Sequence, residues 1–69
     1  MSFSKSIKRV RTEALMTQKE FAEALGVSFT TVNRWENQKM LPSFATVKVI
    51  DAFCKEHGID FDIKSIQEV

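Results

Sequence analysis

The strongest constraint on the fold is a segment of ten residues, 17–26, that signals both ends of one short helix. It starts with TQKE, which has the spacing of a capping box: the Thr17 hydroxyl accepts a hydrogen bond from the backbone N–H of Glu20, and the Glu20 carboxylate accepts one from the backbone N–H of Thr17. Gly26 suits the left-handed residue that ends many helices. The apolar residues between these signals lie on one helical face, at Phe21, Ala22 and Leu25. The segment therefore predicts a helix of about two turns over 18–25.

A second short helix is predicted directly after this one. Ser28 is a candidate N-cap, and Val32 and Trp35 are spaced as on one helical face. Residues 30–32 are all β-branched, which on propensity alone favours a strand. Because propensity is a weak guide over so short a window, the spacing and the preceding glycine lead us to expect a helix through Glu36. Two short helices joined by such a turn form a helix-turn-helix.

A helix is also predicted before this pair. Its apolar stripe has spacings of four, three and four residues and comprises Phe3, Ile7, Val10 and Ala14. Ser2 or Ser4 is a candidate cap for its start. Four bases lie off the stripe, at Lys5, Lys8, Arg9 and Arg11. We therefore expect a helix with a buried apolar face and an exposed cationic face.

The last predicted helix begins at Ser43 after Pro42, because proline cannot continue a preceding helix and serine is a good N-cap. It closes at His57 and Gly58. Its apolar stripe comprises Phe44, Val47, Ile50, Phe53 and Cys54. Residues 59–63 then alternate between apolar and polar, which predicts an extended tail or an arm that pairs with a partner, since a lone strand leaves its own backbone unpaired.

Length and composition fit a single all-α domain. A chain of 69 residues has room for one domain, and two glycines with one proline cannot supply the turns of a sandwich or a barrel. The apolar fraction of 43% is ordinary for a globular protein. The predicted core takes the inward positions of all four helices: Phe3, Ile7, Val10, Phe21, Ala22, Leu25, Val32, Trp35, Val47, Ile50 and Phe53.

Charge is unevenly distributed, although the net charge of the whole chain is only +1. Residues 1–39 carry seven bases and four acids, whereas residues 40–69 carry three bases and five acids. A basic half weakly indicates a surface that faces a polyanion. A solvated surface with no partner explains the same distribution equally well.

The central segment resembles the phage Cro/repressor (Xre-type) helix-turn-helix family. The shared pattern includes Gln18, Ala22, Gly26, Ser28 and Glu36 at fixed spacings and extends over about residues 5–57. The resemblance implies a lambda repressor-like bundle of four to five helices. It also implies a recognition helix, about residues 28–37, that enters the major groove, and dimers that bind inverted repeats.

The resemblance carries over to particular residues. Gln18 matches a glutamine that contacts phosphate or supports the base-reading side chains, and Glu36 matches a structural acid within the bundle. The exposed recognition positions are Ser28, Phe29, Thr30, Asn33 and Arg34. Lys39 follows this helix and is a candidate for a phosphate contact.

The chemistry of these side chains agrees with that assignment. Arg34 has the fork that binds guanine O6 and N7, and Asn33 suits adenine N6 and N7. The ring of Phe29 or the methyl group of Thr30 can pack on a thymine methyl group. Each residue has a structural alternative: Arg34 can pair with Glu36 or Glu13, the ring of Phe29 can tuck against the bundle, and the others can simply face solvent.

One departure from the family affects the loop after the recognition helix. Where members usually have Asn-Gly-Lys, this chain has Asn-Gln-Lys at residues 37–39. Glutamine adopts a positive φ less easily than glycine does. The left-handed residue therefore falls on Gln38 at a cost, or on Asn37, or the loop takes a different path.

Enzymatic activity is not expected. The chain has one His, one Cys and no Tyr, which excludes a disulfide framework and a multi-cysteine zinc site. Cys54 and His57 lie three residues apart on a predicted helix, but no third partner or glycine-rich loop accompanies them. We interpret Cys54 as a core residue and His57 as a helix cap. No cofactor or metal is expected, and no small-molecule ligand, because so small a bundle has little room for a pocket of ~300 Å³.

Together these features predict a sequence-specific, double-stranded DNA-binding transcriptional regulator of repressor type. We expect a cytoplasmic protein of a bacterium or phage that binds an inverted repeat as a homodimer, with no membrane association because no apolar run approaches ~20 residues. Residues 1–57 would form the DNA-binding domain and 58–69 a tail for dimerisation or for a partner. Two alternatives remain open: a protein-interaction module, and the DNA-targeting module of a toxin–antitoxin or restriction–modification system.

Overall fold

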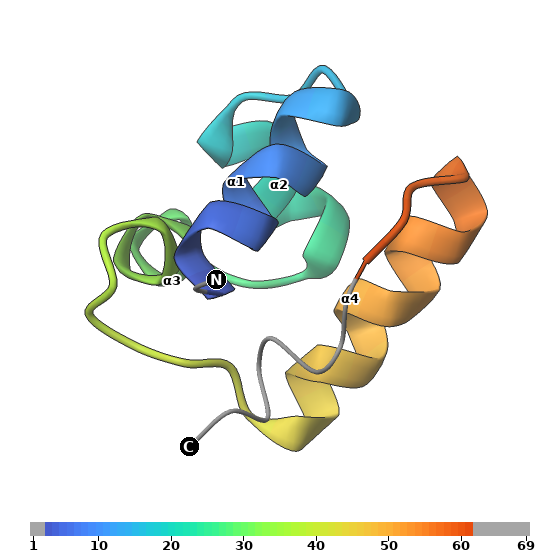
Figure 1. Ribbon diagram of the computed structural model, residues 1–69. Coiled ribbons are helices and arrows are strands. Elements are labelled where there is room, and N and C mark those ends of the chain that lie inside the picture. Colours follow the sequence, from blue (N-terminus) through green and yellow to red (C-terminus); the bar gives the residue numbers. More distant parts are fainter. Residues whose placement is uncertain (1–2, 62–69) are drawn as a thin grey trace.

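The computed structural model describes residues 3–61 of the chain, and this part contains four helices (Figure 1). They are α1 (Phe3–Glu13), α2 (Gln18–Leu25), α3 (Phe29–Glu36) and α4 (Phe44–His57). No strand occurs in this part of the chain. The all-α fold with a helix-turn-helix predicted from the sequence is therefore confirmed.

Side chains cap the starts of three helices as the sequence predicts. The Oγ1 of Thr17 accepts a hydrogen bond from Glu20 N at 3.1 Å, and Thr17 N donates to Glu20 Oε1 at 2.9 Å, which completes the capping box of α2. Ser28 and Ser43 cap α3 and α4 through their hydroxyl oxygens. Because these bonds satisfy N–H groups that have no partner inside a helix, each start is defined locally.

Two glycines end helices in the left-handed conformation. Gly26 has a φ of 74° after α2, and Gly58 has a φ of 66° after α4. Two residues other than glycine in the described range also adopt this conformation, which is less favourable for a residue with a Cβ atom. They are Leu15, with a φ of 59°, and Gln38, with a φ of 61°. The left-handed residue after α3 is thus Gln38, since Asn37 has a φ of −98°.

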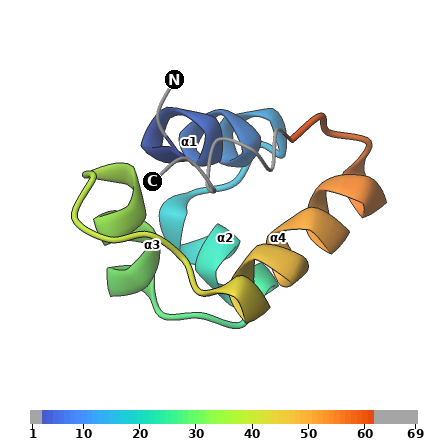
Figure 2. The same ribbon diagram turned by 60° about the horizontal axis from the view of Figure 1, so that its bottom comes forward.

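The core contains all eleven predicted core residues and Cys54, which is also predicted to be a core residue. Phe44, on the predicted stripe of the last helix, is instead 74% exposed, and Ala14 of the first stripe is half-buried. Aromatic rings join the helices in edge-to-face contacts: Phe3 of α1 lies 5.9 Å from Trp35 of α3, and Phe21 of α2 lies 5.3 Å from Phe53 of α4, measured between ring centroids. Both views show α1 and α2 between α3 and α4 (Figures 1 and 2). Within the helix-turn-helix, α3 therefore packs against α1 and α2 packs against α4.

The chain after α4 turns back onto its own domain. Ile59 and Phe61 are half-buried and pack against the core. The backbone oxygen of Asp60 accepts a hydrogen bond from Arg9 Nη2 at 2.5 Å, which ties this segment to α1. Residues 59–61 are therefore not a projecting arm. The remaining residues of the predicted tail, including Ile63, lie outside the described residues, as does the candidate cap Ser2.

A partly open hollow of about 430 Å³ lies between the first turn of α1, the end of α3 and the loop that follows. Its lining comprises Phe3, Ser4, Trp35, Gln38, Lys39, Met40 and Leu41. The expectation that a bundle of this size lacks room for such a volume is wrong, because the hollow forms at the surface, where a loop crosses a helix end, rather than in the core. The absence of a small-molecule ligand stays a prediction. Among residues 3–61, no helix combines the length and the apolar character needed to span a membrane.

Candidate nucleic-acid interface

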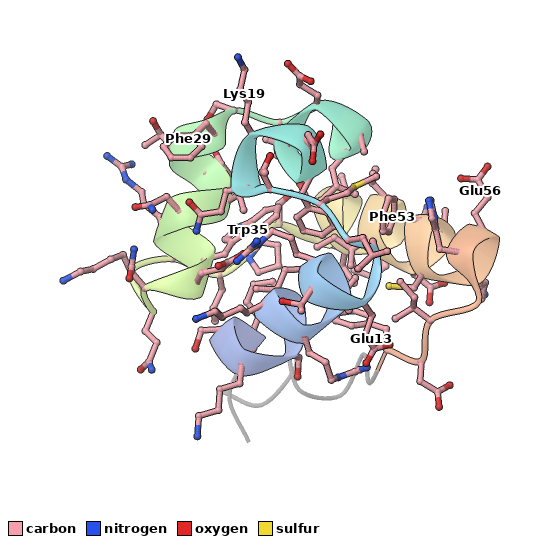
Figure 3. All side chains as sticks on the ribbon, turned by 90° about the horizontal axis from the view of Figure 1, so that it is seen from above. Glu13, Lys19, Phe29, Trp35, Phe53 and Glu56 are labelled. Carbon is pink, nitrogen blue, oxygen red and sulfur yellow. The ribbon has the colours of Figure 1, made fainter. Side chains whose placement is uncertain are left out.

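Residues 17–36 bring the starts of two helices to one edge of the molecule. A turn of three residues, 26–28, joins the end of α2 at Leu25 to the start of α3 at Phe29. Lys19 at the start of α2 and Phe29 lie at the same edge in Figure 3, away from Glu13 on α1. We call this surface the α2–α3 edge. Helix N-termini present N–H groups and partial positive charge, so an edge that carries two of them suits an anionic partner.

Three of the predicted contact residues are exposed on α3 without side-chain hydrogen bonds or ion pairs in the described part of the chain. They are Phe29, Thr30 and Arg34. The exposed fraction of Phe29 is 51%, so its ring is not tucked against the bundle. An apolar ring, a methyl group and a guanidinium group are therefore presented together on one helix.

The structure rules out the alternative that Arg34 pairs with a neighbouring acid. Glu36 is bound by Arg11, with 2.7 Å between Nε and Oε2, and Glu13 is bound by Arg9, with 2.7 Å between Nη1 and Oε2. Among residues 3–61 the guanidinium group of Arg34 thus has no acid partner, and all its donors are open there.

Ser28 and Lys39 lie at opposite ends of α3. The Oγ of Ser28 accepts from Thr31 N at 3.1 Å and is bonded to Thr31 Oγ1 at 2.9 Å, so most of its capacity is used within the helix cap. Lys39 is exposed, and its backbone N donates to Arg34 O at 2.9 Å. Its ammonium group has no hydrogen-bond or ion-pair partner among residues 3–61.

Gln18 on α2 hydrogen-bonds to two side chains of α3. Its Nε2 donates to Glu36 Oε1 at 3.0 Å, and its Oε1 accepts from Asn33 Nδ2 at 3.2 Å. Gln18 thus holds the side chain of Asn33, while base reading by Asn33 stays a prediction. A phosphate contact by Gln18 stays a prediction.

A partly buried ion pair lies next to Gln18. Arg11 donates through Nε to Glu36 Oε2 at 2.7 Å and through Nη2 to Glu36 Oε1 at 3.0 Å, while its Nη1 donates to Met16 O at 3.0 Å. The Glu36 side chain is only 5% exposed. Hydrogen bonding to this carboxylate raises the pKa of Arg11. Glu36 is therefore structural, as the resemblance implies, and Arg11 points inward rather than contributing to an outer cationic face.

Arg9 is also engaged. It pairs with Glu13 and donates to the backbone oxygen of Asp60. Two of the four bases on the cationic face predicted for α1 are therefore paired within the protein. The partners of Arg9 and Arg11 come from the end of the same helix and from distant parts of the chain.

Sequence reasoning missed two polar residues at this surface. Lys19 is exposed in the first turn of α2, next to Gln18, where its position inside the capping box was the available signal. Asn37 is exposed at the end of α3, and its Nδ2 donates to Asn33 Oδ1 at 3.1 Å and to Asn33 O at 2.9 Å. No feature of the sequence distinguishes this amide from a solvent-facing one.

Cys54 and His57 are accounted for by packing. Burial, with a smaller contribution from Asp51, raises the pKa of the Cys54 thiol to about 11, so it is not a nucleophile near neutral pH. The His57 ring stacks on Phe53 at 4.0 Å between centroids, and its Nδ1 lies 2.9 Å from Phe53 O. In residues 3–61, no group of three His, Cys, Asp or Glu side chains is placed to hold a metal ion.

Known proteins match the same region. The family model described as helix-turn-helix matches residues 7–59. The chain is 36% identical over 53 residues to the HTH-type transcriptional activator BcrR of Enterococcus faecalis. The match covers 77% of this chain but 26% of that relative, so the chain spans about a quarter of the relative's length. No solved structure matches the chain.

Proposed function

Since the chain belongs to the helix-turn-helix family, we propose that it is a transcriptional regulator that binds double-stranded DNA in a sequence-specific manner. The observation that carries the proposal is the exposed surface of α3. There the side chains of Phe29, Thr30 and Arg34 have no hydrogen-bond or ion-pair partner within residues 3–61. The neighbouring Asn33 side chain is held by a hydrogen bond to Gln18. A surface that recognises bases needs unpaired hydrogen-bond donors together with neighbouring side chains that are held in place.

The proposed contacts follow from the chemistry of each side chain. Arg34 donates to guanine O6 and N7, Asn33 pairs with adenine, and Phe29 and Thr30 pack on thymine methyl groups. Lys39, Gln18 and Ser28 contact phosphates, which fix the position of α3 in the major groove without reading sequence.

Dimerisation belongs to the proposal as well. One α3 reads only a few base pairs, so a second copy on an inverted repeat, with half-sites about ten base pairs apart, supplies the rest of the specificity. The regulator acts as a repressor when its site overlaps a promoter. The relative of Enterococcus faecalis is named an activator, so activation is the competing outcome for the sign of regulation.

Selection of duplexes from a randomised pool tests the proposal. At ~150 mM salt, where purely electrostatic binding is suppressed, we expect an enriched inverted repeat. Arg34→Ala should lower the affinity for that site by about five- to hundredfold and relax the preference at one base pair of each half-site.

Lys48→Ala is the matched control, because it also removes one exposed positive charge but from α4. It should leave the selected sequence unchanged. If the wild-type chain enriches no sequence, the proposal is wrong, and if Arg34→Ala binds the selected site as the wild type does, its proposed guanine contact is wrong.

A further inference from the structure

Five side chains form a continuous line of hydrogen bonds from inside the bundle to the exposed C-terminal end of α3. The line runs from Arg11 on α1 to Glu36 on α3, then to Gln18 on α2, back to Asn33 on α3 and out to Asn37. Its inner end is the partly buried ion pair between Arg11 and Glu36, and its outer end is exposed. We call it the amide relay.

The charge at the inner end determines the orientation of every amide in the relay. A carboxylate only accepts hydrogen bonds, so Gln18 must turn its NH₂ group toward Glu36 and its oxygen toward Asn33. Asn33 must then turn its own NH₂ group toward that oxygen, which leaves its Oδ1 facing Asn37. Reversing any one amide would place two donors or two acceptors against each other.

Asn37 completes this orientation from the outside. Its Nδ2 donates both to Asn33 Oδ1 and to the backbone oxygen of the same residue, so Asn37 itself is held by two bonds at 3.1 and 2.9 Å. The Asn33 amide is thereby fastened at both its nitrogen and its oxygen before any ligand arrives. One N–H and one lone pair of this amide remain unused.

We propose that Asn37 is a specificity-determining residue that acts through Asn33, by holding its amide in the orientation that distinguishes adenine from guanine. Adenine offers an acceptor at N7 and a donor at N6, which match one remaining N–H and one remaining lone pair. Guanine offers only acceptors at N7 and O6, so it is tolerated only when the amide turns. Asn37 opposes that turn. This inference rests on the proposed function.

Base preference in four variants tests the inference. Asn33→Ala should erase the preference at one base pair of each half-site, which identifies the position that Asn33 reads. Asn37→Ala should lower the ratio of binding to adenine over guanine at that same position by about fivefold and leave the other positions unchanged. The neighbouring exposed residue provides the matched control: Gln38→Ala should leave the ratio as it is.

The double variant Asn33→Ala with Asn37→Ala separates a positioning role from a direct contact. If Asn37 acts through Asn33, its loss has no further effect on base preference once Asn33 is absent. If Asn37→Ala still changes the preference in that background, Asn37 reads a base itself and the inference is overturned. It is also overturned if Asn37→Ala alone keeps the wild-type ratio while Asn33→Ala erases it.

The free protein offers a readout that needs no DNA. Hydrogen exchange of the Asn33 side-chain NH₂ group, followed by NMR, should be slowed in the wild type and accelerated severalfold in Asn37→Ala, with the backbone amides of the core unchanged. Equal exchange in both proteins would overturn the proposed hold on the amide. A wild-type chain that selects no DNA sequence would instead overturn the proposed function, and the inference with it, whatever the exchange rates.

Discussion

Single residues bear backbone strain at two helix ends. Leu15 and Gln38 adopt a left-handed conformation with φ near 60°, which costs a residue with a Cβ roughly 1–2 kcal/mol. Leu15 is 91% exposed and Gln38 is exposed, so neither side chain contributes much burial in return. At these positions the geometry of the turn is imposed by the helices on either side.

Replacing Gln38 with glycine should stabilise the protein. We expect Gln38→Gly to raise the free energy of unfolding by ~0.5–1 kcal/mol, since glycine adopts a positive φ without the Cβ penalty. Denaturation by urea measures the change. Lys39→Gly is the control, because Lys39 is not left-handed, and it should leave stability unchanged or lower. A midpoint for Gln38→Gly at or below that of the wild type would contradict the prediction.

Helices α2 and α3 depend more on the capping residues at their ends than on the helix propensity of their residues. Each has eight residues, which is too short to be stable in isolation. Residues 30–32 are β-branched, yet they are helical because the Ser28 cap starts the helix and Val32 is fully buried. Cap and burial together outweigh propensity here.

The capping box should therefore contribute measurably to stability. We expect Thr17→Ala to lower the free energy of unfolding by ~1 kcal/mol, because Glu20 N loses its acceptor and α2 starts less well defined. Thermal unfolding followed by circular dichroism measures the loss. Lys19→Ala changes an exposed residue of the same turn and should stay within ~0.5 kcal/mol of the wild type. Equal stability of the two variants would show that α2 does not depend on its cap.

At the scale of the whole molecule, one ion pair links α1 to α3. Arg11 and Glu36 are 25 positions apart in the chain, and their side chains are 17% and 5% exposed. The other pair of α1, between Arg9 and Glu13, is 43% and 47% exposed. Exposed pairs contribute little to stability, whereas removal of one partner from a buried pair leaves an uncompensated charge.

Arg11→Met should thus be among the most damaging substitutions outside the apolar core. We expect a loss of about 3 kcal/mol or more, which for so small a domain leaves much of the protein unfolded at 25 °C. The double variant Arg11→Met with Glu36→Met should recover part of the loss, because it leaves no lone charge. Glu13→Ala, at the exposed pair, should cost ~1 kcal/mol at most. If Arg11→Met unfolds in urea like Glu13→Ala, the partly buried pair is not what links these helices.

The amino-acid sequence alone is enough to predict the helices, their caps and the core. These features rest on neighbours within about four positions, and the capping box, the glycine ends and the apolar stripes are all of this kind. It also determined the family, because the helix-turn-helix pattern lies within twenty consecutive residues. Local apolar spacing also identifies all eleven predicted core residues, and all of them are buried.

Contacts between helices settle which polar side chains remain available to a partner. Arg9, Arg11, Gln18 and Asn33 find their partners on other elements, and periodicity does not predict such contacts. The path of residues 59–61 and the left-handed Gln38 depend in the same way on packing between segments. A hydrogen bond across helices needs both distance and direction, and these exist only after the helices have packed.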